Sequence, residues 1–247
     1  MATKDLGRVV GRGIVSIIKT GTEGIIDTYT IAYNDGTTST FQVTNGADSF
    51  WEAGTGAYSI QTKGTGAVAN GEKSVAEGLN TVAGSNYSHV EGYASKTVID
   101  PDDTETHSQA AHAEGTGTIA KGVSSHAEGG GTLAKGADSH AEGNSTSAMG
   151  GASHAEGNWT ITNNFAEHAE GTFNKSNMAS STFGNAGNTL HSVGIGKSTG
   201  ELKDDRKNAF EIMQNGDIYM IGLGGYDGTN PSTAKSIQEL ILEIINK

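Results

Sequence analysis

The sequence predicts an all-β protein whose central part is a parallel β-solenoid with 14-residue coils. The first reason is a repeat, because the pentapeptide Ser-His-Ala-Glu-Gly and its close variants recur with a constant spacing of 14. Its evenly spaced histidines are His112, His126, His140, His154 and His168. The second reason is composition, since 37 of 247 residues are Gly and only 34% are hydrophobic. A catalytic site is needed once per chain, so a repeated motif indicates architecture.

Charge and missing residue types exclude several function classes. The formal net charge is −12 and the cations are scattered, which disfavours a nucleic-acid partner. The chain has no Cys, so disulfides and thiolate metal sites are excluded. A zinc nucleoside deaminase, whose motif also begins His-x-Glu, would need two cysteine ligands. We expect neither a signal peptide nor a membrane span, because the apolar run at 14–18 is too short for either.

Residues 1–50 are predicted to form a small β domain that attaches the protein to other components. Strands are expected at 15–19, 28–33 and 37–44, where Thr, Ile and aromatic residues are frequent. The sequence Asn34-Asp35-Gly36 lies between the last two and predicts a hairpin. Trp51, at the junction with the next region, is expected to serve packing.

Residues 51–198 are predicted to be the solenoid shaft. A second motif, Thr followed by a branched residue and Ala, starts eight residues before the histidines, at Thr81, Thr118, Thr132, Thr146 and Thr160. Each coil therefore has two short strands that end at turns, and coils stack about 4.8 Å apart. About eight coils are expected between 65 and 185. Val75 replaces the histidine upstream, and Thr182 occupies the next histidine position downstream.

The alternation of the motif places His and Glu on one face of the strand, and Ser, Ala and Gly on the other. Small residues suit the inside of a narrow coil, so the His/Glu face meets either water or another chain. We expect an axial, inter-subunit ladder in which hydrogen bonds and partial protonation offset carboxylate repulsion. The ladder comprises His89, His112, His126, His140, His154, His168, Glu91, Glu114, Glu128, Glu142, Glu156 and Glu170. Repetition favours this structural role over metal binding, and we expect no metal and no cofactor.

One insertion interrupts the period, because His112 follows His89 at a spacing of 23 instead of 14. It is acidic and would loop out of the stack, either as a plain loop or as a subunit clamp or receptor contact. The candidate receptor-contact residues are Asp100, Asp102, Asp103, Glu105 and His107. The aromatic residues Trp159, Phe165 and Phe173 are expected to serve the core or an interface, with sugar binding as the alternative.

Residues 199–247 are predicted to form a β-hairpin and a short helix. Asn215-Gly216 between two apolar runs indicates a type I′ turn. The helix is expected over 232–246, with Ser232 or Thr233 as its N-cap. Its apolar positions Ile237, Leu240 and Ile244 fit either a helix trimer or packing against the roll.

The repeat unit resembles the head repeat of trimeric autotransporter adhesins, and SVGIG at 192–196 is nearest to that form. The SHAEG version resembles repeats of bacteriophage tail-fibre and other minor structural proteins. The segments at 11–46 and 204–230 also resemble modules of phage structural proteins. The resemblance covers about half of the chain and implies a parallel homotrimer of left-handed β-rolls.

From this resemblance we expect a virion structural protein, a trimeric tail, neck or head fibre that contacts the host surface. Its expected partners are other copies of the chain, other virion proteins through the N-terminal domain, and a host glycan or protein. A bacterial trimeric cell-surface adhesin is the first alternative, disfavoured by the missing export signal. A polysaccharide-acting enzyme is the second. We expect no enzyme, because no carboxylate pair stands apart from the repeat.

Overall fold

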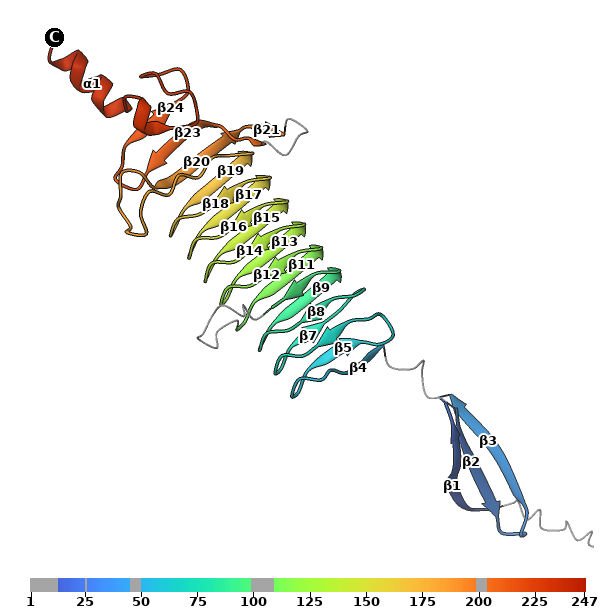
Figure 1. The fold of residues 1–247 in the computed structure, drawn as a ribbon. Helices are drawn as coiled ribbons and strands as arrows, with labels where there is room; N and C mark the ends of the chain where they lie inside the picture. The colour runs from blue at the N-terminus through green and yellow to red at the C-terminus, as the bar shows by residue number, and fades with distance from the viewer. Residues whose placement is uncertain (1–12, 25, 45–49, 99–108, 199–203) are drawn as a thin grey trace, which may run out of the picture. The chain divides into compact units, whose positions relative to one another are not determined.

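The computed structural model describes residues 13–24, 26–44, 50–98, 109–198 and 204–247 (Figure 1). The chain divides into two compact units, Met1–Phe50 and Trp51–Lys247. The predicted shaft and the predicted C-terminal segment thus belong to one unit. The receptor-contact residues predicted at 100–107 of the insertion lie outside the described residues. No described helix has the length and apolar character needed to cross a membrane.

The first unit is an antiparallel sheet of three strands in the order β1-β2-β3. These are β1 (Ile14–Glu23), β2 (Ile26–Tyr33) and β3 (Thr38–Thr44). The predicted hairpin between β2 and β3 is confirmed. The Gly36 amide donates to the Tyr33 carbonyl at 3.1 Å, and the Tyr33 amide donates to the Thr37 carbonyl at 3.0 Å. Gly36 has a φ of 80°, which closes this three-residue loop.

The second unit is a β-solenoid, as predicted, with two parallel sheets that share its coils (Figure 1). One sheet has seven strands, each of two residues and one per coil, so the stack has seven such coils rather than eight. They are β6 (Val68–Ala69), β8 (Val82–Ala83), β10 (Lys96–Thr97), β12 (Ile119–Ala120), β14 (Leu133–Ala134), β16 (Ser147–Ala148) and β18 (Ile161–Thr162). Five of these strands, β8, β12, β14, β16 and β18, directly follow the threonines of the predicted second motif.

The other sheet contains the SHAEG strands and extends beyond them at both ends. Its parallel strands are β5 (Ile60–Thr62), β7 (Val75–Ala76), β9 (His89–Tyr93), β11 (His112–Thr116), β13 (His126–Gly130), β15 (His140–Asn144), β17 (His154–Asn158), β19 (His168–Thr172) and β20 (Thr189–Ile195). Like residues pair with like, for example His126 with His140 and Ala127 with Ala141. At the N-terminal edge, β4 (Trp51–Ala53) pairs antiparallel with β5.

The solenoid core is made of alanine. Among the described residues from Ala67 to Ala155, the buried apolar side chains are alanines apart from Val90. Buried serines and threonines lie beside them, and the Ser153 hydroxyl donates to the Gly150 carbonyl at 2.7 Å. The predicted inward direction of Ser and Ala is therefore confirmed. The two sheets can lie close together because no larger side chain separates them.

The stacking requires glycine at two positions of the regular coils between His112 and Asn158. Gly143 has a φ of 102°, and a Cβ there would lie 2.2 Å from the Gly157 carbonyl oxygen of the next coil. A Cβ on Gly136 would lie 1.9 Å from the Gly150 carbonyl oxygen. Both distances are far below a van der Waals contact. Glycine is therefore required at these positions for two reasons. The backbones of adjacent coils lie too close together for a Cβ, and the turn needs glycine's conformational freedom.

The stack continues further than the sequence suggested. His191, rather than Thr182, pairs with His168, because a second insertion, as long as the first, lies between them. Thr182 is exposed in the segment that precedes β20. Asn174 closes the free edge of the seven-stranded sheet, since its side chain accepts from the Ile161 amide at 2.7 Å and donates to the Ile161 carbonyl at 2.9 Å. An amide side chain thus replaces the missing strand.

After β20 the chain changes from parallel to antiparallel pairing. β20 pairs with β23 (Asn208–Met213), which pairs with β24 (Ile218–Met220), while β21 (Lys197–Ser198) pairs with β22 (Asp204–Asp205). The predicted hairpin is confirmed, but its turn type was wrong. Gly216 has a positive φ of 92° and Asn215 does not, whereas a type I′ turn needs both. The Met213 amide bonds to the Asp217 carbonyl at 2.8 Å across a three-residue loop.

The C-terminal helix begins later than predicted. Residues Pro231–Thr233 form a short 3₁₀ helix, and α1 spans Ile237–Ile245. Its N-cap is Ser236, whose side chain accepts from the Glu239 amide while Glu239 accepts from the Ser236 amide. Ser232 and Thr233 are not the cap because Pro231 and the Asn230 side chain hold them in the separate 3₁₀ turn.

Candidate functional site

The His/Glu face forms one continuous array on the twelve-stranded sheet. All twelve predicted ladder residues lie there, and the structure adds Glu77 before them and His191 after them. We call this array the His–Glu ladder. The sequence could have revealed His191, because its spacing of 23 from His168 equals the spacing between His89 and His112.

The imidazole rings of the ladder are stacked. Ring centroids are 4.7 Å apart for His112–His126, His126–His140 and His140–His154, with interplanar angles of 4–6°. The separation equals the spacing of adjacent β-strands, so the in-register backbone imposes it. The stack ends at His191, whose ring meets His168 edge-on at 74°. That rung carries Val193 where the others carry Glu.

The imidazoles of His126 and His140 each lie between two carboxylates but hydrogen-bond to neither. His126 Nε2 is 4.0 Å from Glu114 Oε1 and 3.9 Å from Glu128 Oε2, beyond the range of a hydrogen bond. Its side chain is 34% exposed, yet the Nε2 atom itself is buried. Five Nε2 atoms are buried without a hydrogen-bond partner in the described part of the chain, those of His112, His126, His140, His154 and His168. The predicted imidazole–carboxylate hydrogen bonds are therefore not formed within one chain.

The carboxylates of the ladder share protons. Hydrogen bonds to Glu114 and Glu142 raise the pKa of Glu128 to about 7, and Glu77 and Glu114 do the same for Glu91. The pKa of Glu114 is lowered by the complementary hydrogen bonds with Glu128 and Glu91. The pKa values of neighbouring ladder carboxyls are thus shifted in opposite directions, and the carboxyls titrate as a coupled set. This lowers the repulsion that a fully ionised stack would suffer.

Three imidazoles of the ladder have a lowered pKa, which favours their neutral form. Burial lowers the pKa of His112, His126 and His154, and the neighbouring imidazoles lower it further. At neutral pH these three imidazoles therefore present neutral nitrogen donors beside the ladder carboxyls. Three overlapping groups place two imidazoles and one carboxylate with ligand atoms within 4.8 Å of one another: His112–Glu114–His126, His126–Glu128–His140 and His140–Glu142–His154. A fourth group is Glu77–His89–Glu91.

Sequence reasoning missed a buried acid at the end of the repeat. Glu167 occupies the position of Ser125, Ser139 and Ser153 and is almost fully buried. One oxygen accepts from the amides of Asn163 and Asn164 and from the Ser176 hydroxyl, at 2.8–2.9 Å. Burial raises the pKa of Glu167 to about 7 despite these bonds. Its role is to tie the last regular coil to the segment that follows.

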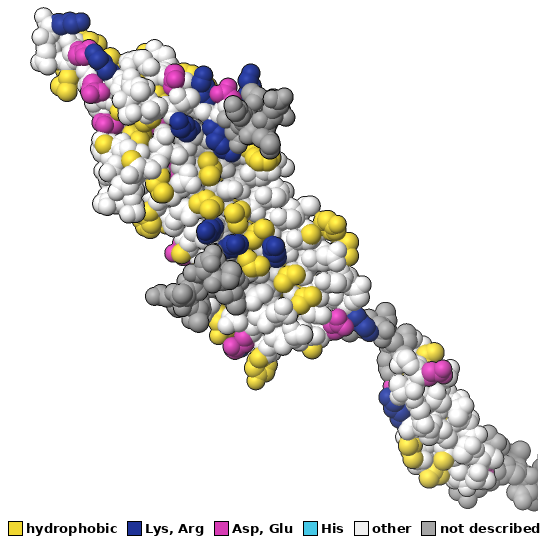
Figure 2. All heavy atoms as spheres, in the orientation of Figure 1, with side chains coloured by type: hydrophobic (Ala, Val, Ile, Leu, Met, Phe, Trp, Pro, Cys, Tyr) yellow, Lys and Arg dark blue, Asp and Glu magenta, His cyan; other side chains and the backbone are white. Residues whose placement is uncertain are grey.

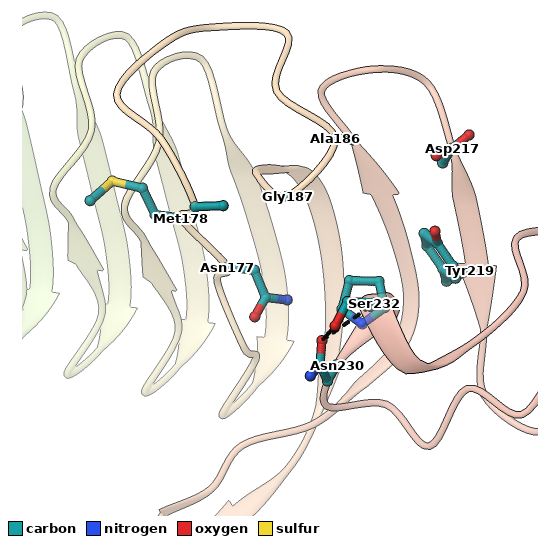
Figure 3. A pocket seen from close by; sticks show the side chains of 10 residues that line it. Asn177, Met178, Ala186, Gly187, Asp217, Tyr219, Asn230 and Ser232 are labelled. Carbon is teal, nitrogen blue, oxygen red and sulfur yellow. Dashed lines mark hydrogen bonds between the residues drawn. The ribbon is translucent and has the colours of Figure 1, made fainter.

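A cleft of about 420 Å³ lies between the segment at 177–187, the β23–β24 hairpin and the 3₁₀ turn (Figure 3). Asp217 is the one carboxylate among its lining residues. Its Oδ2 accepts from the Asn215 side chain, and the Asn230 side chain accepts from Ser232. The cleft therefore lacks the carboxylate pair that glycoside hydrolysis requires.

The aromatic candidates lie near the C-terminal end of the solenoid. The rings of Trp159 and Phe173 stack with centroids 5.7 Å apart, and Phe173 is buried, as expected for packing. Arg206 lies over Phe173 and donates to the Trp159 carbonyl at 2.7 Å. Trp159 is 44% exposed, and Phe165, in edge contact with Phe183, is also exposed.

No protein-family model, curated protein or solved structure matches this chain.

Proposed function

We propose that this chain is the subunit of a virion fibre or spike, assembled as a parallel homotrimer of left-handed β-rolls. The observation that carries the proposal is the inverted placement of apolar residues. Alanine fills the solenoid core, while isoleucine, phenylalanine and tryptophan side chains lie outside it. Hydrophobic side chains are visible at the surface of both units (Figure 2). Burial between chains would give these residues the apolar environment that one chain lacks.

The N-terminal sheet supports association most directly. Its larger apolar side chains are exposed: Ile14, Val15, Ile17, Ile18, Ile26, Phe41 and Val43. A small sheet with no covered face is not independently stable, since strands need a hydrophobic face packed against something. Three such sheets could cover one another around an axis. The same segment is the proposed attachment to other virion proteins.

The C-terminal helix supports the same assembly. No residue of α1 is buried, and Ile241, Leu242, Ile244 and Ile245 are exposed, Ile244 by 72%. A nine-residue helix with an uncovered apolar face is marginal in water. A seam of Ile237, Leu240 and Ile244 at an axis would bury that face in three copies at once.

The virion assignment rests on the resemblance of the SHAEG repeats and flanking segments to phage fibre proteins. In this role the solenoid is a shaft, and its loops contact the surface of the host cell. A structural role fits the repeat because each coil offers the same surface. The alternative is a bacterial cell-surface adhesin with the same roll, and the experiment must distinguish it from a virion protein.

The first test is the native mass in solution, measured by light scattering after size exclusion over a range of concentrations. One chain has a mass of 25.3 kDa, and we expect the mass of three. A monomer at all concentrations would overturn the fibre proposal. Electron microscopy with antibodies against the purified trimer then locates it in cultures of the source. Labelled virus particles support the virion role, and label confined to bacterial surfaces supports the adhesin.

A further inference from the structure

We propose that the His–Glu ladder binds divalent first-row transition-metal ions, with Zn²⁺ as the ion to test. The inference concerns atoms of a single chain and does not depend on the fibre assignment. It revises the sequence-based expectation of a metal-free ladder. The reason is geometric, because the hydrogen bonds that were expected to satisfy the imidazoles are not formed.

The unpartnered imidazole nitrogens are the first argument. Nε2 of His112, His126 and His140 is buried and makes no hydrogen bond within the described chain. Leaving a buried polar atom without a partner costs free energy, and five rungs repeat that cost. Carboxylate oxygens lie 3.9–4.0 Å from these three Nε2 atoms, too far for a hydrogen bond. A cation between nitrogen and oxygen would satisfy both.

The set of donors is the second argument and selects the kind of ion. Each of the three overlapping groups offers two imidazole nitrogens and one carboxylate oxygen. Imidazole suits Zn²⁺, Cu²⁺ and Ni²⁺, whereas Ca²⁺ and Mg²⁺ require mostly oxygen ligands. The carboxylate supplies negative charge beside the ion. Water, or side chains of a neighbouring chain in an assembly, would complete the coordination.

The distances require the ligand atoms to move closer together. Zn–N bonds are about 2.0–2.1 Å long and zinc sites are tetrahedral, so two ligand atoms of one ion lie about 3.4 Å apart. The ligand atoms of each group lie within 4.8 Å of one another, and His126 Nε2 is 4.0 Å from Glu114. Rotation of side chains that are one-third exposed can supply the difference. The backbone register needs no change.

Neighbouring groups cannot all be filled. The groups around Glu114 and Glu128 both use His126, and those around Glu128 and Glu142 both use His140. Ions one coil apart would also repel each other strongly. If only the first and third of these overlapping groups bind an ion, no ligand is shared, and two sites remain, around Glu114 and Glu142. With the group around Glu77, His89 and Glu91, we expect about three ions per chain in the described ladder, a number set by ligand sharing.

The experiment uses untagged full-length protein, stripped with EDTA, dialysed against ZnCl₂ and then against buffer. Metal per chain is measured by elemental mass spectrometry, and binding by calorimetry. The test variant is His126→Asn with His140→Asn, which removes one ligand from each of the two predicted sites. We expect retained zinc to fall from about three ions to about one, because imidazole loss breaks each site.

His191→Asn is the matched control. His191 belongs to the same stack and lies 3.7 Å from Glu170, but it belongs to no three-ligand group among the described residues. Its zinc content should equal that of the natural chain. Zinc should also raise the melting temperature of the natural chain and EDTA should reverse the shift. No retained zinc, or equal zinc in the double variant and the control, would overturn the proposal. The native mass, measured on the same samples, tests the trimer separately.

Discussion

His168 and His191 stand opposite each other on neighbouring parallel strands, although their spacing in the sequence is 23 instead of 14. Their ring centroids are 4.9 Å apart, the spacing of the ladder, but the rings meet at 74° instead of lying parallel. The backbone register therefore survives the insertion, whereas the side-chain stack ends. The stack ends here because the next strand, β23, runs antiparallel and brings Phe210 to His191 in place of another histidine.

Substitution of the glycine that closes each SHAEG motif should lower stability more than substitution elsewhere in the coil. In Gly143→Ala the new Cβ would meet the Gly157 carbonyl oxygen at 2.2 Å, so the coils must separate locally. We expect a loss of about 3 kcal/mol or more, combining strain at positive φ with the broken stack. Chemical denaturation of the purified protein measures it.

Gly131→Ala provides the comparison for that variant. Gly131 also has a positive φ, 65°, but its nearest neighbour would be the Ser145 side chain at 3.6 Å. The cost should stay near the roughly 1–2 kcal/mol of a left-handed alanine. Equal losses in the two variants would show that φ alone, and not coil contact, fixes the glycines.

Replacing a core alanine of the solenoid with a larger side chain should destabilise the fold. Ala141 is fully buried between the two sheets, so Ala141→Val inserts two methyl groups into closed space. We expect a destabilisation of about 1–3 kcal/mol. Ala137→Val, at an exposed position of the neighbouring turn, should change stability by less than about 0.5 kcal/mol. A neutral Ala141→Val would mean that the sheets can separate freely.

The raised carboxyl pKa values of the ladder predict that stability falls as the pH rises toward and through about 7. The pKa of Glu128 is raised from 4.5 to about 7, so the folded state binds its proton more tightly than the unfolded state does. That contribution is complete below pH 4.5 and is lost as pH rises through about 7. The lowered pKa of His126 acts oppositely, since its contribution is complete above 6.5 and is lost as pH falls. Above pH 6.5 the glutamates therefore dominate.

The variant Glu91→Gln with Glu128→Gln tests this pH dependence. It should flatten the fall in melting temperature as the pH rises through about 7, because neutral amides replace carboxyls that lose shared protons. Glu52→Gln, an exposed position outside the ladder, should retain the natural slope. If the double variant also retains it, the ladder carboxyls titrate as independent, ordinary groups.

The helix cap distinguishes the structure from the sequence-based expectation. Ser236→Ala removes the capping box with Glu239 and should cost the helix about 1 kcal/mol. Ser232→Ala removes a hydroxyl that donates to the Asn230 side chain in the 3₁₀ turn, so the amides of α1 should keep their protection from hydrogen exchange. Amide exchange at Leu240 and Ile241 reports the difference. Faster exchange in Ser232→Ala alone would support the cap that the sequence predicts.

The sequence by itself determined the solenoid, its inward Ala and Ser, and the outward His and Glu, because a strict period fixes which residues stack. Local turn and strand signals also located the hairpins after Tyr33 and Met213. Only the tertiary structure decided the rest. The burial of Glu167 and the closure of the sheet edge by Asn174 are long-range contacts that no local pattern encodes. Likewise, the distance from imidazole to carboxylate follows from strand spacing and side-chain length together, and it left Nε2 of His126 without the bond that its sequence neighbours suggested.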